Sequence, residues 1–246
     1  MDPAAYALHA DVEARHFWFR GRRAVVGKVI DGLGLRRGAR VIELGAGTGG
    51  NLPMLERLGD VVAVEPEDAA RAIAHARSPG VTFLPSLDAL SGPAFDAAFA
   101  FDVLEHLDDP PADLRRLGAW MVPGAPLVVT VPAHPALFGA HDTYLHHHRR
   151  YTEATLRQHL RDGRFVVEHV TPINAAMLPA AALMRVVEGA RSLAFRSAPA
   201  PRGMSVPPAP LNALLTAAFA VERHLVTRRV PFGLSLLAIA RAPGAA

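Results

Sequence analysis

Short apolar runs that alternate with helical stretches constrain this chain more than any other feature. The first five runs are apolar almost throughout, as expected for strands buried on both faces of a sheet. Their alternation with helices predicts βα units around a parallel sheet. We therefore expect one α/β domain, for which 246 residues is a suitable length. The expected strands are Arg40 to Leu44, Asp60 to Val64, Val81 to Leu84, Asp96 to Phe101, Pro126 to Val131, Phe165 to His169 and Leu234 to Ala240.

Two segments lie outside this pattern. A helical stretch from Asp11 to Ile30 precedes the first strand, and two apolar helical stretches, Ala180 to Phe195 and Leu211 to Thr227, separate the last two strands. The prolines between Pro199 and Pro210 predict a mobile hinge between these two stretches. We expect one domain built from a helical cap (1–38), a core (39–170), a helical insertion that acts as a lid (171–230), and the last strand with its tail (231–246).

Composition excludes several chemistries. The chain has no cysteine, which rules out disulfides, thiolate metal sites and cysteine nucleophiles. The net charge is only +3 and no block of basic residues forms a polybasic tail, which argues against a nucleic-acid partner. No apolar run is long enough to cross a bilayer and the first residues do not resemble a signal peptide, so we expect a cytoplasmic protein.

A glycine-rich turn follows the first expected strand. Gly45, Gly47 and Gly49 differ in spacing from the G-x-G-x-x-G turn that seats the pyrophosphate of a dinucleotide. Glu43, just before the turn, would repel a pyrophosphate but suits a cationic ligand with an α-amino group. Glu65 closes the next strand, about twenty residues after the turn, where a carboxylate meets ribose hydroxyls.

This stretch resembles the first motif of class I S-adenosylmethionine-dependent methyltransferases. Phe95 to His106 is similar to the family's fourth motif, and Met121 to Gly124 to the turn before its fifth strand. The resemblance implies a Rossmann-like fold, with a seven-stranded, mostly parallel sheet covered by helices on both faces, and S-adenosylmethionine as cofactor. It also implies cofactor contacts from Glu43, Gly45, Ala46, Gly47, Gly49, Glu65, Pro66, Ser86, Leu87, Phe101, Asp102 and His106. Ser86 stands where the family usually has an aspartate that binds the adenine amino group, which leaves Leu87 to contribute backbone and packing.

The densest polar segment, Pro132 to Thr152, follows the fifth strand at the edge where α/β sheets bind ligands. A subset of small-molecule methyltransferases looks similar here, with a His-Asp pair followed by His-His-x-Arg-Arg-Tyr. A hydroxyl acceptor needs a base, and we expect His147 first and His141 second, with Asp142 orienting the imidazole. Expected substrate contacts are Trp18, Tyr144, Arg149, Arg150 and Tyr151. In the alternative interpretation Thr152 caps a helix from Glu153 to Leu160, and the arginines pair only with acids on that helix.

A metal site is the other chemistry that this edge could hold. Asp102, Glu105 and His106 form a D-x-x-E-H pattern, and carboxylates with imidazole bind divalent ions. In the alternative interpretation, Glu105 and His106 only open the helix after the fourth strand. We favour this alternative and expect no metal.

The sequence therefore predicts methyl transfer from S-adenosylmethionine to a small-molecule or lipid-like acceptor. The alternatives are an RNA- or protein-directed methyltransferase and a catalytically idle protein that binds the cofactor. The segment after the fourth strand lacks the Asn/Asp-Pro-Pro-aromatic element that holds an exocyclic base amine, and no RNA-binding signature is present. The apolar insertion favours a hydrophobic acceptor or contact with a membrane surface.

Overall fold

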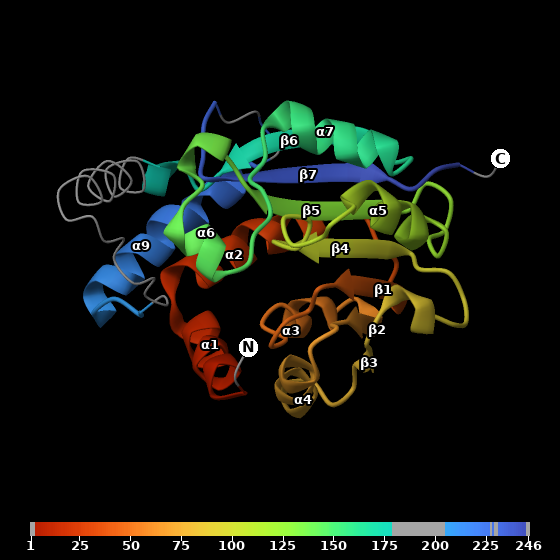
Figure 1. Ribbon diagram of the computed structural model, residues 1–246, viewed down its shortest axis with the longest axis horizontal. Coiled ribbons are helices and arrows are strands. Elements are labelled where there is room, and N and C mark those ends of the chain that lie inside the picture. Colours follow the sequence, from red (N-terminus) through yellow and green to blue (C-terminus); the bar gives the residue numbers. More distant parts are fainter. Residues whose placement is uncertain (1–2, 179–204, 227, 229–230, 245–246) are drawn as a thin grey trace.

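A single seven-stranded sheet forms the centre of the protein (Figure 1). The computed structural model describes residues 3–178, 205–226, 228 and 231–244. The strand order is β3-β2-β1-β4-β5-β7-β6, with β1 to β5 parallel and β7 antiparallel to both of its neighbours. The predicted Rossmann-like sheet is therefore confirmed. The strands are β1 (Ala39–Leu44), β2 (Gly59–Val64), β3 (Thr82–Leu84), β4 (Ala97–Phe101), β5 (Pro126–Pro132), β6 (Val166–Ile173) and β7 (Ser235–Arg241).

Helices cover both faces of the sheet because side chains of successive strand residues point to opposite sides. Val41 packs in one apolar core with Val25, whereas Ile42 packs in the other with Leu114 and Leu117. The helices are α1 (Pro3–Arg15), α2 (Phe17–Asp31), α3 (Leu52–Leu55), α4 (Asp68–Arg77), α5 (Pro110–Gly118), α6 (Ala140–Tyr144), α7 (Glu153–Asp162) and α9 (Ala209–Val221). Short 3-10 turns are η1 (Leu87–Ala89), η2 (Pro135–Leu137), η3 (Ala175–Met177) and η4 (Glu222–His224).

The structure corrects two predicted boundaries. The single helix expected from Asp11 to Ile30 is wrong, because the chain is extended at His16, whose ring nitrogen accepts a hydrogen bond from the Trp18 N–H and so starts a second helix. β6 continues beyond His169 to Ile173. Pro172 can belong to this strand because β6 lies at the edge of the sheet, where a missing N–H is tolerated.

The insertion between β6 and β7 is described only in part. The predicted stretch Ala180 to Phe195 and most of the expected hinge lie outside the described residues. The second stretch forms α9 and η4, which pack against α2. The two helices approach so closely at Gly21 that a Cβ there would lie 2.4 Å from the Phe219 ring. No helix in the described ranges is long and apolar enough to cross a membrane.

Candidate active site

The glycine-rich turn after β1 has the open backbone that a closely bound ligand requires. Gly45, Gly47 and Gly49 all have left-handed φ angles, of 70°, 54° and 82°, which side-chain-bearing residues rarely adopt. A Cβ on Gly45 would lie 2.4 Å from Val103, whereas Gly47 has no neighbour within 4 Å of that position. The turn therefore packs tightly at Gly45 and leaves free space at Gly47.

Glu65, at the end of β2, holds this turn in place. Its carboxylate accepts hydrogen bonds from the Gly47 N–H at 2.8 Å and the Glu67 N–H at 2.9 Å. Burial raises the pKa of Glu65, although these two N–H groups act in the opposite direction. The predicted ribose-binding acid therefore lies directly beside the turn.

Glu43, near the end of β1, is fully buried below the turn. One carboxylate oxygen accepts a hydrogen bond from the Asn51 side chain at 2.9 Å, and the other has no partner among the described residues. Burial raises the pKa of Glu43 to about 8, against a usual value of 4.5. Such a carboxyl ionises readily when a cationic group comes close, as expected for a ligand with an α-amino group.

Helix α1 covers the cofactor side, and its contribution was missed in the sequence. Glu13 is buried and accepts hydrogen bonds from the Thr48 hydroxyl at 2.7 Å and from Arg77 at 3.3 Å. Burial, with Glu67 and Glu65 nearby, raises the pKa of Tyr6 to about 12. In the sequence, Glu13 cannot be distinguished from any other acidic residue of a surface helix, so its contact with the glycine-rich turn could not be predicted.

The other residues expected at the cofactor lie at the same edge of the sheet, because adjacent parallel strands end there. Ala46, Leu87 and Phe101 are buried, and Pro66 is exposed. Ser86 directly precedes η1 and makes no capping bond with its side chain. These positions follow or end β1, β2, β3 and β4.

Asp102 follows β4 and is engaged with Arg22 of α2. It has an unusual φ of 56°, pairs with the Arg22 guanidinium, and accepts a hydrogen bond from Thr130 at 3.0 Å. Arg22 itself is buried, so the pair connects α2 to the end of β4. A strained residue held by such contacts is typical of a functional site.

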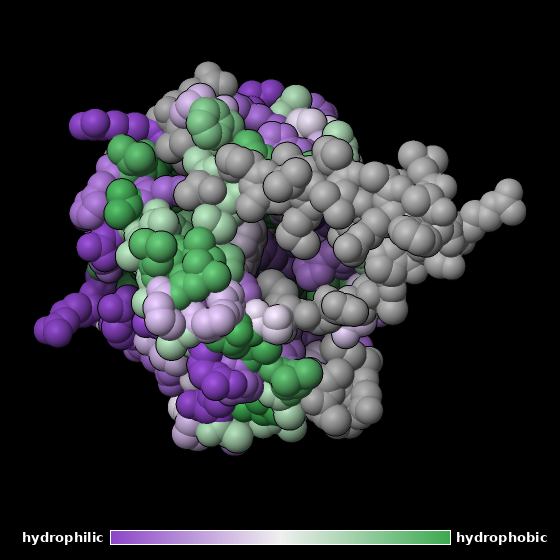
Figure 2. Space-filling view, turned by 90° about the vertical axis from the view of Figure 1, so that its left-hand side faces the viewer, coloured by the Kyte–Doolittle hydropathy of each residue, from purple (hydrophilic) through white to green (hydrophobic). Residues whose placement is uncertain are grey.

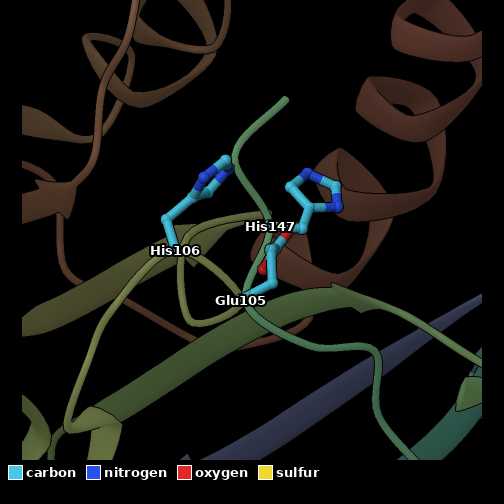
Figure 3. Close-up of side chains that lie close together, drawn as sticks. All are labelled: Glu105, His106 and His147. Atoms are coloured by element: carbon cyan, nitrogen blue, oxygen red, sulfur yellow. The ribbon is translucent and has the colours of Figure 1, made fainter. Parts of the chain in front are cut away.

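Glu105, His106 and His147 form the most notable cluster at this edge (Figure 3). One ligand atom from each of these residues lies within 4.8 Å of those of the other two. The prediction that Glu105 and His106 open a helix is wrong, because they lie in a turn and α5 begins only at Pro110. The three residues of the D-x-x-E-H pattern therefore do not form the cluster. His147 takes the place of Asp102 beside Glu105 and His106, and Asp102 pairs with Arg22 instead.

The pKa values of Glu105 and His106 in this cluster are both shifted from their usual values. Glu105 is fully buried, and neither carboxylate oxygen has a hydrogen-bond partner in the part of the chain that the structure describes. Burial, with Asp102 nearby, raises its pKa well above the usual value. His106 is exposed, but partial desolvation by the surrounding chain and the neighbouring His147, whose ring centroid is 4.7 Å away, lower its pKa to about 4. His106 is therefore a neutral imidazole at neutral pH.

Asp142, the acid expected to orient a catalytic imidazole, contacts His147. One Asp142 oxygen lies 3.0 Å from Nδ1 of His147 and accepts a hydrogen bond from Arg150 at 2.7 Å, while the other accepts one from the Gly139 N–H. Although burial raises the pKa of Asp142, the bonds from His147 and Arg150 outweigh burial and lower it below its usual range. Because the carboxylate is ionised, Nδ1 carries the proton and Nε2 is left as the acceptor.

The remaining residues expected at the substrate fall into two groups. His141 and Tyr144 are exposed on α6, and Arg149 donates to the Asp108 carbonyl. The others serve the fold instead. Arg150 is held by Asp142 and the Ala133 carbonyl, Tyr151 is buried and donates to the Leu104 carbonyl at 3.0 Å, and Trp18 packs near the Phe219 ring. Thr152 caps α7, as the alternative interpretation expected.

Comparison with known proteins identifies the family. Residues 14–185 match the family model described as a methyltransferase domain. The chain belongs to this family: it is an S-adenosylmethionine-dependent methyltransferase domain. The glycine-rich turn, Glu43 and Glu65 fit the cofactor, because the turn leaves room at Gly47 and the acids suit its ribose and ammonium groups.

Individual proteins match this chain at lower levels of sequence identity, between 19% and 33%. A ubiquinone biosynthesis O-methyltransferase of Methylocella silvestris is 33% identical over 134 residues, which is 50% of this chain and 50% of that protein. This chain therefore matches only half the length of that relative. Among solved structures, the methyltransferase in complex with the Trm112 activator of Haloferax volcanii has a TM-score of 0.62 at 19% identity, covering 99% of this chain and 96% of that one. An S-adenosylmethionine-dependent methyltransferase of Mesorhizobium loti has a TM-score of 0.56 at 20% identity, covering 89% and 97%.

Proposed function

We propose that the protein transfers a methyl group from S-adenosylmethionine to a hydroxyl group of a small, lipid-like acceptor, with His147 as the general base. The observation that carries the proposal is the contact between Asp142 and His147 at 3.0 Å, at the ligand edge of the sheet. A hydroxyl acceptor loses its proton as the new carbon–oxygen bond forms, so an oriented imidazole is a suitable acceptor for that proton.

In this proposal, each residue around His147 has a separate role in the proton transfer. Nε2 of His147 accepts the proton of the acceptor hydroxyl, and the ionised Asp142 stabilises the imidazolium that results. Arg150 keeps Asp142 in place from the other side, at 2.7 Å. When bound, the cofactor supplies the reactive methyl group, and Glu43, Gly47 and Glu65 would hold it beside the cluster.

Two observations favour a small-molecule acceptor over an RNA or protein. The relative in Methylocella silvestris is named for ubiquinone biosynthesis and O-methylation. The base-amine element of nucleic-acid methyltransferases is missing after β4, where Asp102 and the following turn stand instead. An idle cofactor-binding protein would have no use for the Asp142–His147 pair.

The test is an acceptor screen with the purified full chain. Methyl-labelled S-adenosylmethionine is incubated with a lipid extract, a fraction of small phenolic compounds, total RNA and a protein extract, and label is followed by mass spectrometry. We expect methylated products in the lipid or phenolic fraction. Label found only in RNA or protein would contradict the proposal, and tight cofactor binding without any product would favour the idle alternative.

A divalent metal ion at Glu105, His106 and His147 is a second candidate, and two observations favour it over the metal-free site expected from the sequence. Glu105 has two buried oxygens without a described partner, and His147 is oriented by a carboxylate as metal-bound histidines usually are. An ion held there would favour the ionised form of a bound hydroxyl. Full activity after dialysis against EDTA would support the metal-free base, whereas loss restored by Mg²⁺ or Zn²⁺ would favour the ion.

A further inference from the structure

Helix α9 is apolar on every side yet largely exposed. Its 13 residues, Ala209–Val221, include no charged side chain, and the polar ones are Asn212 and Thr216. Only Asn212 and Phe219 are buried, while Leu214 is 66% exposed and Val221 59% exposed. An apolar helix of this kind normally lies inside a protein or in contact with lipid.

Both ends of α9 are fixed to the folded domain. Asn212 accepts a hydrogen bond from the Phe17 N–H at 2.8 Å and donates one to the Arg15 carbonyl at 2.9 Å. Glu222, directly after the helix, accepts the backbone N–H groups of Asn174 and Ala175. The exposed leucines are therefore presented by a firmly held helix.

A basic groove begins where α9 ends. It has a volume of about 460 Å³ and lies between α2, the turn after α3, and η4. Its cations are Arg23, Lys28, Arg57 and Arg223, with His224 beside them and Asp31 as the carboxylate. Within the described part of the chain, no ion pair includes Lys28, Arg57 or Arg223. The groove is thus a cationic surface free to receive anions.

Helix α9 lies at the same end of the molecule as the active site. The arrowheads of β4 and β5 point toward the end of the molecule that carries α6 and α9 (Figure 1). Figure 2 looks onto that end and shows strongly hydrophobic residues gathered on the surface among hydrophilic ones. A flat surface that contacts α9 is therefore close to the edge that carries His147.

We propose that the outer face of α9 and the adjoining basic groove dock the protein onto a bilayer that contains anionic lipids. Leucine and valine side chains of an interfacial helix enter the acyl boundary, while nearby Lys and Arg side chains attract lipid phosphates. Thirteen residues are too few to span a bilayer, so α9 lies along its surface. A two-fold contact between copies that paired α9 with α9 would bring two cationic grooves together, and a nucleic-acid site would have no use for the exposed leucines.

Vesicle flotation with the full chain tests the proposal. The protein is mixed with vesicles of phosphatidylcholine alone or with phosphatidylglycerol added, and we expect it to float with the anionic vesicles and to dissociate at high salt. Leu214→Glu with Val221→Glu places two charges on the apolar face and should reduce the bound fraction on the order of tenfold. Lys28→Glu with Arg223→Glu should weaken binding at least about 25-fold, since each surface cation contributes about 1 kcal/mol, roughly a fivefold change.

Matched controls separate docking from a change of net charge. Val166→Glu alters an apolar residue that is 63% exposed on the edge strand β6, and Arg115→Glu with Arg161→Glu reverses two exposed charges on α5 and α7. These variants should float like the wild type, and all variants should keep the wild-type affinity for S-adenosylmethionine. Wild-type protein that ignores anionic vesicles overturns the proposal, as does binding that survives both α9 substitutions. A dimer in light scattering that Leu214→Glu dissociates would identify a second copy as the occupant instead, and binding to RNA rather than vesicles would identify a nucleic acid.

Discussion

The part of the sheet edge around Glu43, the glycine-rich turn and Glu65, here the cofactor half, differs from the part around Glu105 and His147, here the substrate half, where we propose that the acceptor binds. The two halves differ in the hydrogen-bond partners of Glu43, Glu65 and Glu105. In the cofactor half, Glu65 accepts two backbone N–H groups and Glu43 an Asn51 amide, all from within about twenty residues of the glycine-rich turn. In the substrate half, Glu105 has no hydrogen-bond partner for either oxygen among the described residues. His147 reaches it from a loop that follows a different strand. The hydrogen bonds of Glu43 and Glu65 are thus local, whereas the Glu105–His147 cluster is assembled from distant segments.

This difference has a physical consequence. Hydrogen bonds to backbone groups fix the cofactor half before any ligand arrives, so the free energy of binding is not used to order it. In the substrate half, the buried carboxyl of Glu105 without a described partner costs stability, which proteins tolerate mainly where the group serves function. The predictions below test whether the halves are as separate as their contacts indicate.

The largest effect is expected for His147→Ala in the substrate half. Loss of a general base typically lowers the rate by about 10²–10⁴-fold, so kcat should fall within this range while the dissociation constant of S-adenosylmethionine stays unchanged. His146→Ala is the matched control, since His146 is exposed in the same loop. Equal turnover in the two variants would show that the segment has no catalytic part, and lost cofactor binding would show that the two halves are not separate.

The next effect is expected for Glu65→Ala in the cofactor half. The substitution removes the expected ribose contact, which contributes about 1.5–3 kcal/mol, together with the two hydrogen bonds that hold the turn in place. The affinities for S-adenosylmethionine and its demethylated product should both fall about 100-fold in calorimetry. Asp68→Ala, which removes an exposed acid three positions later, should change neither.

A smaller, pH-dependent effect is expected at Glu43. With a pKa of about 8, this carboxyl is largely protonated in the free protein at pH 7 and should lose its proton when a cationic group binds. Cofactor binding should therefore release up to about one proton at pH 7, and affinity should rise with pH until about pH 8. Without cofactor the sign is reversed for stability: a raised pKa contributes stability below pH 4.5, and this contribution is lost as pH approaches 8.

Calorimetry in two buffers of different ionisation enthalpy measures this proton. Glu43→Gln removes the titrating group with little change of shape, so its binding enthalpy should not depend on the buffer. Proton release that persists in Glu43→Gln would assign it to another group and leave Glu43 a structural acid.

The smallest effect is expected for Tyr151→Phe. The variant loses the hydroxyl that donates to the Leu104 carbonyl, so the free energy of unfolding should fall by about 1 kcal/mol in urea denaturation. The KM of the acceptor should not change, because Tyr151 is buried below the site. Tyr144→Phe on the exposed helix α6 should leave stability within about 0.5 kcal/mol. A raised KM of the acceptor for Tyr151→Phe would instead show that the Tyr151 hydroxyl contacts the substrate.

The sequence predicted the sheet well and grouped the residues expected at the cofactor around one turn, because both inferences depend on local patterns. Apolar runs identify buried strands, and Glu43, the glycines and Glu65 lie at short, fixed spacings around one turn. The helix break at His16 could not be predicted, because a histidine at a helix N-cap does not interrupt the spacing of apolar residues on either side.

The substrate half was predicted only in part, because its contacts join residues far apart in the chain. The Asp142–His147 pair lies within one loop and was anticipated, whereas the meeting of His147 with Glu105 depends on how two loops fold over the same edge. In the cofactor half, the contacts of Glu13 and Arg22 from the first two helices were missed for the same reason, since composition gives no measure of such distances. Tyr151 was misplaced because an aromatic residue beside a polar loop fits a pocket and a core equally well.

The position of β7 between β5 and β6 determines when the sheet can be completed during synthesis. β6 has no strand partner other than β7 among the described residues, and β7 begins only at Ser235, whereas β6 ends at Ile173. A nascent chain that has already emerged through Ile173 therefore carries β5 and β6 with unpaired edges until Ser235–Arg241 has been added. Unpaired edges are where chains associate wrongly. A truncation before Ser235 should consequently leave most of the sequence intact but yield aggregated protein.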